Sequence, residues 1–391
     1  MNKKRILVVG STATSLINFR GDFIQSLTDN GYEVFTAAGY ADEETLSKLT
    51  EDYGVTALTY RIQRTGVNPF MDLQTISDLK KIIAEHQIQL VFPYTVKPVI
   101  YSTIAANSLN VPVISLITGL GFTFTGLSAK ARALQHLNEF LYKRTIRKNK
   151  TVVFQNADDR DLFFERNILR DKSKAKIVSG SGVNLERFKF KDNGQARNPV
   201  RFLLTARLIK EKGIGLYIEA AKTLKTKYPS AEFHVIGPAQ MSPSAIKLEE
   251  LISLNEQGIL IWHGHQYNIV ENLTKVDVFV LPSYYREGVP RSILEALSVG
   301  LPIITTDSPG CRETVIPNKN GFLIPPQSLK ELVDAMEFFI LNPERIEEMG
   351  NNSRAYAEER FDVHIINRNL LKIINNVFNQ QEQESSALHL K

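Results

Sequence analysis

The chain has 391 residues, of which 43% are hydrophobic and 23% are charged, and its formal net charge at pH 7 is +5. This length accommodates two domains of ordinary size, and the composition is that of a globular protein. The modest positive charge does not require a nucleic-acid partner. The single cysteine, Cys311, excludes an intramolecular disulfide and a cysteine-based metal cluster, and it fits a reducing compartment.

The N-terminus carries a basic cluster, but the apolar run that follows it is too short for a signal peptide. Nowhere does the sequence approach the roughly 18 consecutive apolar residues that a membrane-spanning helix needs. These two observations predict a cytoplasmic protein.

Short apolar runs alternate with helical patterns through the first half of the chain, and one of the helical patterns covers residues 72–86. Strands that alternate with helices form a parallel, doubly wound sheet. We therefore predict an α/β domain in this half. Its expected strands are residues 5–9, 33–38, 57–60, 90–93, 113–117, 151–155 and 176–178.

A polar segment without periodicity, residues 189–199, separates this half from a second α/β pattern. The expected helix of residues 214–225 belongs to that second pattern. We predict domains at 1–190 and 198–365, followed by a C-terminal helix and polar tail at 366–391. The expected strands of the second domain are residues 201–205, 232–236, 258–262, 276–281 and 301–305.

Basic residues gather between Ser128 and Lys150, where seven stand against one acidic residue, Glu139. A basic helix of this kind can lie on an anionic membrane surface, but a solvated face gives the same pattern. Phe122 and Phe124, just upstream, are candidates for shallow insertion. The basic residues at the end of this run are Lys143, Arg144, Arg147, Lys148 and Lys150.

The stretch from Leu281 to Gly300 organises the second half of the chain. It follows an apolar strand, turns through Pro282 and Gly288, and begins a helix near Pro290. Gly300, followed by Pro302, ends that helix. The carboxyl ends of parallel strands are where open α/β sheets bind ligands, so this turn is a candidate site.

Two carboxylates, Glu287 and Glu295, bracket this turn with seven residues between them. Eight helical steps span roughly 12 Å, whereas the carboxylates of a retaining glycosidase lie about 5–5.5 Å apart. The spacing therefore favours carboxylates that bind two hydroxyl-bearing parts of one long ligand. The plain alternative is a helix-dipole charge at Glu287 and a surface charge at Glu295.

Two cations, Arg207 and Lys212, lie between a strand and the N-terminus of the next helix. A helix N-terminus attracts phosphate, arginine offers a bidentate fork, and lysine offers a point charge. Read without any comparison, the pair is either a phosphate site or two solvated loop charges.

The stretch from Glu287 to Ala296 resembles the Glu-x7-Glu motif of the family-4 retaining glycosyltransferases, and the resemblance is densest between Arg207 and Gly321. It implies the GT-B fold, in which two doubly wound, Rossmann-like domains face a cleft and a C-terminal helix returns toward the first domain. It also implies that Arg207 and Lys212 bind the donor diphosphate, that Glu287 binds the donor sugar, and that Glu295 binds the ribose.

The same resemblance implies further donor contacts. Backbone groups of Gly288, Val289 and Pro290 would orient the donor sugar, and those near Gly237 and Gly264 would surround the nucleotide base. His263, beside Gly264, is interpreted as structural rather than catalytic.

In the first domain, short segments resemble bacterial members of the family that build surface polysaccharides on lipid carriers. Arg20 and Lys97 are the candidates for the acceptor's phosphates, and the wider acceptor set adds Thr95, Gly119 and Gly121. Many members carry a histidine in the cleft. Neither His86 nor His136 fits that role, because both lie in helical patterns.

We expect no cofactor and no metal. Asp159 and Asp161 resemble a metal-binding Asp-x-Asp, but they open a helix, where acidic residues complement the dipole. Neither a dinucleotide fingerprint nor a phosphate-binding P-loop motif is present in the sequence. Cys311 is expected to pack rather than to react.

The sequence thus predicts a glycosyltransferase that is retaining and metal-independent. Its donor would be a UDP-sugar, either a UDP-N-acetylhexosamine or a UDP-hexose, and its acceptor a lipid-linked or growing surface glycan. Its place would be the inner face of the plasma membrane, as a peripheral protein. The alternatives are a UDP-sugar 2-epimerase of the same fold and a non-catalytic sugar-nucleotide-binding subunit.

Overall fold

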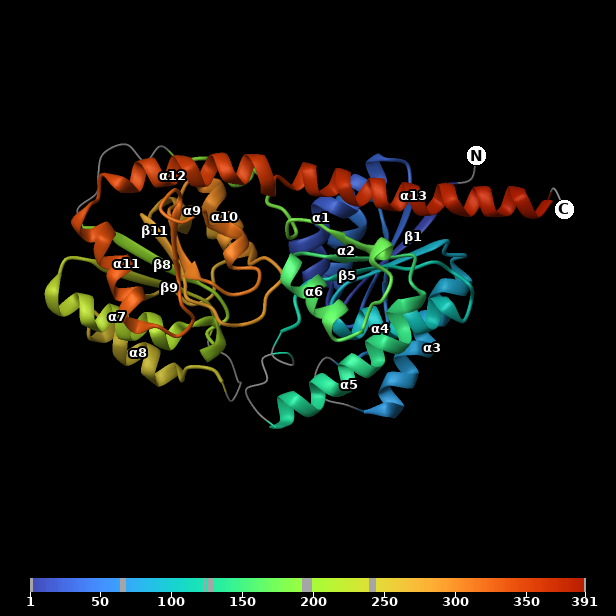
Figure 1. Ribbon diagram of the computed structural model, residues 1–391, viewed down its shortest axis with the longest axis horizontal. Coiled ribbons are helices and arrows are strands. Elements are labelled where there is room, and N and C mark those ends of the chain that lie inside the picture. Colours follow the sequence, from blue (N-terminus) through green and yellow to red (C-terminus); the bar gives the residue numbers. More distant parts are fainter. Residues whose placement is uncertain are drawn as a thin grey trace. The chain divides into compact units, whose positions relative to one another are not determined.

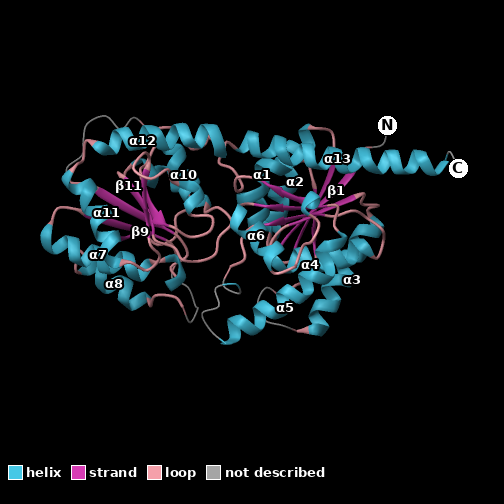
Figure 2. Ribbon diagram, viewed as in Figure 1, coloured by secondary structure: helices cyan, strands magenta, loops and turns pink. Residues whose placement is uncertain are grey.

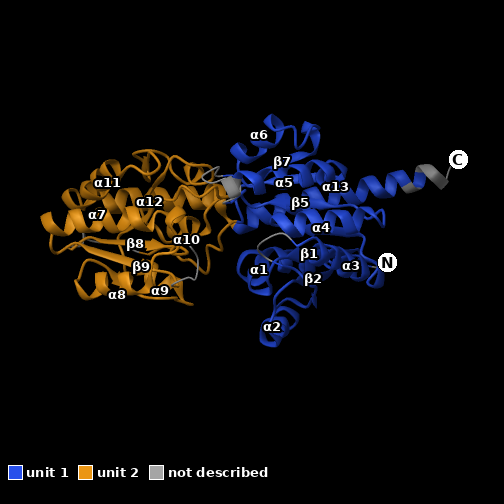
Figure 3. Cartoon of the chain, turned by 90° about the horizontal axis from the view of Figure 1, so that it is seen from below, with its two compact units in different colours: residues 1–181, 363–391 blue, residues 182–362 orange. Residues whose placement is uncertain are grey.

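A computed structural model of the chain describes residues 3–63, 68–121, 124, 129–191, 199–238 and 244–389. The chain forms two compact units, shown in different colours in Figure 3. Unit 1 comprises Met1–Ser181 and Val363–Lys391, and unit 2 comprises Gly182–Asp362. The chain thus enters unit 2 before the polar segment 189–199, and the C-terminal helix belongs to unit 1.

Unit 1 is built on parallel strands. One sheet has the order β3-β2-β1-β4, and a second has the order β5-β6-β7. Isolated parallel bridges, Val91 to Val113 and Tyr94 to Leu116, connect the two sheets. The strands are β1 (Arg5–Gly10), β2 (Glu33–Ala38), β3 (Thr56–Thr59), β4 (Leu90–Pro93), β5 (Ile114–Ile117), β6 (Thr151–Phe154) and β7 (Ala175–Ile177).

Helices alternate with these strands along the chain and cover the sheets (Figures 1 and 2). Successive residues of β1 face opposite sides, with Leu7 in one buried cluster and Val8 in another. The helices are α1 (Ala13–Asp29), α2 (Glu43–Tyr53), α3 (Pro69–Glu85), α4 (Val96–Asn107), α5 (Ala129–Thr145), α6 (Ala157–Glu165) and α13 (Val363–His389).

Helix α13 packs into unit 1 although it follows unit 2 in the chain. Its Ile366, Leu370 and Ile374 belong to the same buried cluster as Ile6 and Val8 of β1. Apolar residues at that spacing form one stripe of a helix. The helix is therefore part of the core of unit 1.

Unit 2 contains one six-stranded parallel sheet with the order β10-β9-β8-β11-β12-β13. Its strands are β8 (Arg201–Thr205), β9 (Glu232–Ile236), β10 (Ile261–Trp262), β11 (Val278–Leu281), β12 (Ile303–Thr306) and β13 (Gly321–Ile324). Its helices are α7 (Ile214–Lys227), α8 (Leu248–Glu256), α9 (Ile269–Thr274), α10 (Arg291–Val299), α11 (Leu329–Leu341) and α12 (Arg345–Tyr356).

The predicted α/β class and the predicted helix after β11 are confirmed. Pro290 is the N-cap of α10, and Gly300 ends it at φ +85° in the left-handed region that favours glycine. Two expectations were wrong in extent. Strand β10 covers only two of the five residues expected, and α5 ends at Thr145, so that Lys150 lies outside the helix. Within the described residues, no helix combines the length and hydropathy needed to span a bilayer.

Candidate functional site

The two predicted phosphate-binding cations lie at the carboxyl end of β8. Arg207 follows the strand, and Lys212 ends a 3-10 turn, Lys210–Lys212, directly before α7. Gly213 joins the turn to the helix at φ +81°, and a Cβ there would lie 2.2 Å from the carbonyl oxygen of Pro282. Only glycine therefore lets this turn lie against the loop that follows β11.

Hydrogen bonds connect the same two loops. The carbonyl oxygen of Glu211 accepts the backbone N–H groups of Tyr284 (2.9 Å) and Tyr285 (3.0 Å). The Ser283 hydroxyl oxygen also lies 3.3 Å from this carbonyl oxygen. The turn that carries Lys212 is thus fixed against the segment that carries Glu287.

Lys212 and Glu287 form an ion pair, with Nζ 2.5 Å from Oε1, and both side chains are largely buried, at 12% and 13% exposed. The Ser283 hydroxyl donates to the same carboxylate oxygen at 3.0 Å. Charge-assisted bonds of this kind hold both groups in one geometry. Two predicted donor-binding residues, far apart in sequence, therefore lie in direct contact.

The ring of Tyr285 lies beside both cations. Its centroid is 5.4 Å from the Arg207 guanidinium carbon and 5.3 Å from the Lys212 ammonium nitrogen. Both distances lie within the range of a cation–π interaction. Arg207, Lys212, Tyr285 and Glu287 thus form one cluster, which we call the cation cluster.

Glu295 lies on the first turns of α10 and pairs with Arg291, whose Nε is 3.0 Å from Oε1. Burial raises the pKa of the Glu295 carboxyl, and the charge and hydrogen bond of Arg291 oppose that rise. A carboxylate held in this way can accept hydroxyl hydrogens from a ligand. Sequence reasoning missed Arg291, although its spacing of four residues from Glu295 on one helix was the available signal.

The segment before α10 is buried, with Val289 7% exposed, and it packs against a second glycine turn. Gly310 has φ +79°, and a Cβ there would lie 2.0 Å from the Gly288 carbonyl oxygen. Cys311 is fully buried next to it, and burial first, with the nearby Glu287 charge second, raises its pKa to about 12. This thiol therefore packs and remains protonated, as expected.

The turns after β9 and β10 contact each other. The N–H of Gly237 donates to the carbonyl oxygen of Gly264 at 2.9 Å, and a Cβ on Gly237 would lie 2.1 Å from the Ala206 carbonyl oxygen. His263 Nε2 is 2.9 Å from His234 Nδ1, and His234 Nε2 is 3.1 Å from Glu232 Oε2. His263 is thus part of a hydrogen-bonded network with His234 and Glu232.

Of the predicted acceptor residues of unit 1, Thr95, Gly119 and Gly121 lie in the turns after β4 and β5, Lys97 lies in the first turn of α4, and Arg20 lies within α1. Arg20 is 3% exposed, and its guanidinium lies 5.2 Å from the ring centroid of Tyr94. Tyr94 and Ser15 share a 2.7 Å hydrogen bond between their hydroxyls. Burial raises the pKa of Tyr94 to about 12, so its hydroxyl stays neutral.

Thr95 precedes α4 with φ +67° and ψ 165°, a backbone region that only glycine adopts readily. Its hydroxyl is 3.0 Å from that of Ser11. Such strain costs on the order of 1–3 kcal/mol and gathers at functional sites. Thr95 is therefore the described residue of unit 1 whose backbone most strongly supports a binding role.

Lys97 pairs with Asp72, with Nζ 3.3 Å from Oδ1, and both side chains are largely buried. The turn after β5 carries Gly119 and Gly121, both in left-handed conformations at φ +101° and +63°. The predicted acceptor residues thus lie near the carboxyl ends of β4 and β5 and on α1, but Lys97 already has a carboxylate partner.

Two cations of the basic run and one of the upstream phenylalanines are engaged elsewhere. Arg147 donates from its guanidinium to the carbonyl oxygens of Asn167 and Ile168, and Lys150 pairs with Glu384 at 3.2 Å. Phe124 is 8% exposed and so is not available for insertion, whereas Phe122 lies outside the described residues. Of the five basic residues at the end of the run, Lys143, Arg144 and Lys148 remain, and two exposed apolar side chains of α5, Leu137 and Phe140, precede them.

The Asp-x-Asp segment forms the start of α6. Asp159 is fully buried, and its carboxylate accepts the side-chain amide of Asn156, whose own oxygen caps the helix. Asp161 is exposed and pairs with Arg160. Both carboxylates are therefore engaged locally.

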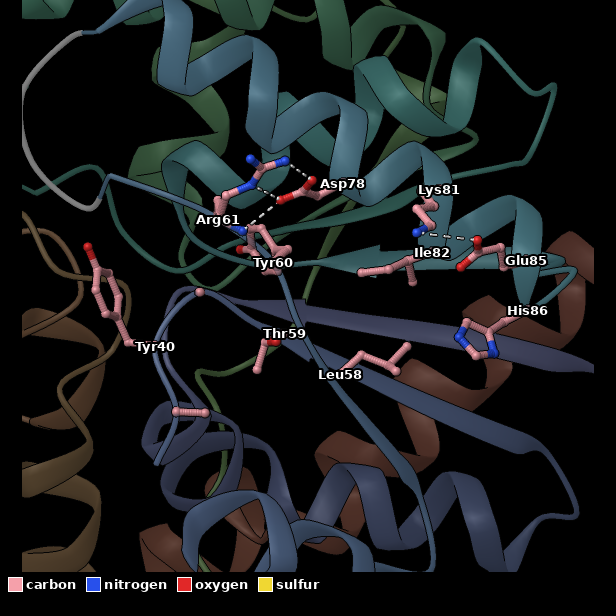
Figure 4. Close-up of a pocket in the computed structure, with 12 residues that line it drawn as sticks. Tyr40, Leu58, Thr59, Tyr60, Arg61, Asp78, Lys81, Ile82, Glu85 and His86 are labelled. Carbon is pink, nitrogen blue, oxygen red and sulfur yellow. Dashed lines mark hydrogen bonds and ion pairs between the residues drawn. The ribbon is translucent and has the colours of Figure 1, made fainter. Parts of the chain in front are cut away.

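A pocket of about 620 Å³ in unit 1 contains none of the predicted residues (Figure 4). It lies between β3 and α3, and its charged side chains pair with each other. Arg61 binds Asp78 at 2.5 Å, and Lys81 lies 3.7 Å from Glu85. Because these groups are already paired, we assign the pocket no role.

Two family models match the chain. The model described as glycosyl transferases group 1 matches residues 186–356, and the model described as glycosyl transferase 4-like matches residues 5–156. The first lies within unit 2 and the second within unit 1.

Among curated relatives, the chain is 28% identical to the N,N'-diacetylbacillosaminyl-diphospho-undecaprenol alpha-1,3-N-acetylgalactosaminyltransferase of Campylobacter jejuni. That match covers 95% of this chain and 99% of the relative. This chain is also 27% identical to the UDP-Gal:alpha-D-GlcNAc-diphosphoundecaprenol alpha-1,3-galactosyltransferase of Escherichia coli. That match covers 69% of this chain and 71% of the relative.

Two solved structures are similar over nearly their whole length. The sucrose-phosphate synthase of Thermosynechococcus elongatus superimposes with a TM-score of 0.78 at 15% identity, covering 97% of this chain and all of that one. The HepE protein of Anabaena, solved in complex with UDP, gives a TM-score of 0.74 at 18% identity, covering 95% of this chain and all of that one. At such identities the likeness concerns the fold.

Proposed function

The chain belongs to the family-4 glycosyltransferases and has their GT-B fold, and on this basis we propose that it moves a sugar from a UDP-sugar to a lipid-linked acceptor. The observation that carries the donor half of the proposal is the cation cluster at the carboxyl edge of unit 2. The relatives named above transfer sugars to diphosphate-linked lipids, and one of them uses UDP-Gal. Their names describe transfer, which disfavours the epimerase alternative.

Arg207 and Lys212 would bind the donor diphosphate and stabilise the charge that develops as UDP departs. Lys212 is already paired with Glu287 at 2.5 Å, so the ligand joins a preformed cation–carboxylate pair. Glu287 would then accept hydrogen bonds from the hydroxyls of a hexose or N-acetylhexosamine. The backbone at Gly288, Val289 and Pro290 would orient that sugar.

Glu295 would accept the ribose hydroxyls, with Arg291 holding the carboxylate in place. The backbone of the Gly237 and Gly264 turns would surround the base. Because Glu287 is occupied by Lys212 and Ser283, it is poorly suited to act as a nucleophile. We therefore propose transfer with retention by front-face attack, in which the leaving phosphate receives the acceptor's proton.

The acceptor would be bound by unit 1. Arg20 and Lys97 would contact its phosphates, while Thr95, Gly119 and Gly121 supply backbone close to the ligand. The strained backbone of Thr95 supports this assignment, since strain of this kind persists where function requires it.

A lipid-linked acceptor stays in the bilayer, so we propose that the enzyme works as a peripheral protein on the inner face of the plasma membrane. The surface that supports this consists of Leu137, Phe140, Lys143, Arg144 and Lys148, which we call the α5 surface. Phe140 is 52% exposed, and Arg144 lies 5.2 Å from its ring centroid. Exposed apolar groups among cations are typical of helices that lie on membranes.

We further propose that transfer needs no metal, because Asp159 and Asp161 are engaged at the start of α6. Activity should therefore survive EDTA, and Asp161→Asn should be nearly silent. Loss of activity on chelation that Mn²⁺ or Mg²⁺ restores would contradict this part of the proposal.

The donor proposal is tested by thermal unfolding with UDP-, GDP- and ADP-sugars. A ligand present at 100 times its dissociation constant adds about 2.7 kcal/mol to the free energy of unfolding. We expect UDP-sugars to raise the melting temperature and Arg207→Ala to abolish the rise. Stabilisation by GDP- or ADP-sugars alone would mean that the donor nucleotide is not UDP. Stabilisation by none of these sugars would overturn the donor assignment.

A further inference from the structure

Tyr285 is the described residue that contacts both cations of the cluster. Its ring centroid lies 5.4 Å from Arg207 Cζ and 5.3 Å from Lys212 Nζ, although the three side chains come from two different loops. Aromatic rings carry negative potential on their faces and attract cations within about 6 Å. One ring therefore interacts with both groups assigned to the donor diphosphate.

The backbone of Tyr285 is fixed where this contact requires it. Its N–H donates to the Glu211 carbonyl oxygen at 3.0 Å and lies 3.3 Å from the Ser283 hydroxyl. Glu211 directly precedes Lys212 in the same turn. The ring position is thus tied to the turn that carries one of its two cations.

The two cations beside the Tyr285 ring differ in their carboxylate partners. Lys212 has the Glu287 carboxylate at 2.5 Å, whereas Arg207 pairs with no carboxylate in the part of the chain that the structure describes. Arg207 is also exposed, and a long exposed side chain loses rotamer freedom when a ligand orders it. The Tyr285 ring lies within cation–π distance of both Arg207 and Lys212.

We propose that Tyr285 is a positioning residue that preorganises Arg207 and Lys212 for the donor diphosphate. The inference rests on the proposed donor site and extends it by a residue that contributes an aromatic face rather than a charge. Preorganised charges stabilise a leaving group without reorganising during the reaction. Loss of the ring should therefore weaken both UDP binding and turnover.

The first test measures UDP affinity by calorimetry for the wild type, Tyr285→Phe and Tyr285→Leu. Two cation–π contacts predict a loss of about 5- to 30-fold for Tyr285→Leu, and near-wild-type affinity for Tyr285→Phe, which keeps the ring. Tyr284→Leu is the matched control, because Tyr284 makes the same backbone bond to Glu211. Equal losses in the Tyr284 and Tyr285 variants would assign the effect to loop packing and overturn the inference.

The second test separates the ring's electrostatics from its shape. Tyr285→trifluorophenylalanine keeps the shape and removes most of the negative potential, so its UDP affinity should fall below that of Tyr285→Phe. Equal affinities of these two variants would overturn the inference, and this comparison remains decisive if Tyr285→Leu does not fold.

The third test is a double-mutant cycle with Arg207→Ala. If the ring acts through the cations, Tyr285→Leu should cost much less in the Arg207→Ala background than in the wild type. Additive losses would contradict the proposal. A wild-type protein that binds no UDP would overturn the donor assignment and this inference together, whereas unchanged UDP affinity in every Tyr285 variant would overturn this inference alone.

Discussion

At the residue scale, three of the four charged groups assigned to the donor, Lys212, Glu287 and Glu295, are paired before any ligand is bound. Lys212 pairs with Glu287, and Arg291 pairs with Glu295, all four side chains being no more than 15% exposed. Burying a lone charge is costly, and each of these side chains has an opposite charge within hydrogen-bond distance. Donor binding then exchanges or adds partners, so the site needs little reorganisation.

Arg207→Ala tests the diphosphate contact most simply. Removing a donor that stabilises developing charge is expected to lower kcat by on the order of 10²–10³. Lys210→Ala is the control, because Lys210 lies in the same turn, is exposed, and has no assigned role. Turnover of the two variants is compared in a UDP-release assay, with the fold checked by circular dichroism. Similar activities would refute the assigned role of Arg207.

The sequence indicated the identities of these residues but not their pairing. Position and spacing left Arg207, Lys212, Glu287 and Glu295 as either ligand contacts or ordinary surface charges, and the family resemblance assigned them to the donor. The contact of Lys212 with Glu287 joins loops 75 positions apart in the chain, and no local pattern encodes it. For the same reason, the number of basic residues in the run could not show that the Arg147 guanidinium donates to the carbonyl oxygens of Asn167 and Ile168.

At the element scale, the close contact of two loops depends on Gly213. Its φ of +81° and the 2.2 Å approach to the Pro282 carbonyl oxygen leave no room for a side chain. Gly215, two residues on in α7, has nothing within 4 Å of an added Cβ. Gly215→Ala is therefore a matched control for Gly213→Ala.

Gly213→Ala should lower the free energy of unfolding by at least about 1–2 kcal/mol, the cost of a left-handed residue. Gly215→Ala should raise it by about 0.5–1 kcal/mol, because alanine is the better helix former. Denaturant titration measures both. An unchanged free energy of unfolding in Gly213→Ala would mean that the loops are not in the close contact described.

The His234–His263 pair predicts a pH effect on the stability of unit 2. Burial lowers the pKa of both imidazoles below 6.5, and Glu232 partly opposes this at His234. Nearby charges are Arg201 and Asp277 around His234, and Lys275 around His263. Protonation of both facing nitrogens would remove the acceptor from the 2.9 Å bond between the rings.

Because the folded pKa values are depressed, the folded protein binds fewer protons than the unfolded chain. The stability is complete above about pH 6.5 and is lost as pH falls toward the folded values. Denaturant midpoints between pH 7.5 and 5.5 should therefore fall less in His263→Gln than in the wild type. His265→Gln, an exposed neighbour, should behave as wild type. Identical pH profiles for all three proteins would contradict this prediction.

At the scale of the whole molecule, the alternation of strands and helices sufficed to predict two α/β domains. It did not yield the unit boundary, because chain entry at Gly182 is set by packing rather than by local polarity. The return of α13 to unit 1 entered only through the family resemblance. The apolar stripe of Ile366, Leu370 and Ile374 predicts that one face of the helix is buried. It does not predict which of the two units contains that core.

The α5 surface predicts reversible membrane binding. Each cation near an anionic surface contributes about 1 kcal/mol, so Lys143, Arg144 and Lys148 supply about 3 kcal/mol, with a further part from Phe140. Cosedimentation with anionic liposomes should be strong at 0.1 M salt and weak at 1 M, where the Debye length falls to about 3 Å.

A variant with these three cations changed to glutamine should lose the binding. The control changes Lys80, Lys172 and Lys176, three exposed cations elsewhere in unit 1, and so removes the same charge. Equal losses in both variants would indicate a net-charge effect and remove the case for the α5 surface.

We propose that this chain transfers a sugar from a UDP-sugar to a lipid diphosphate with retention. The most direct measurement incubates the purified protein with a UDP-sugar and a polyprenyl diphosphate-linked monosaccharide, and determines the anomeric configuration of the new bond by NMR. We expect a disaccharide whose new linkage keeps the configuration of the donor. An inverted linkage, an epimerised donor formed without acceptor, or no product with any UDP-sugar would contradict it.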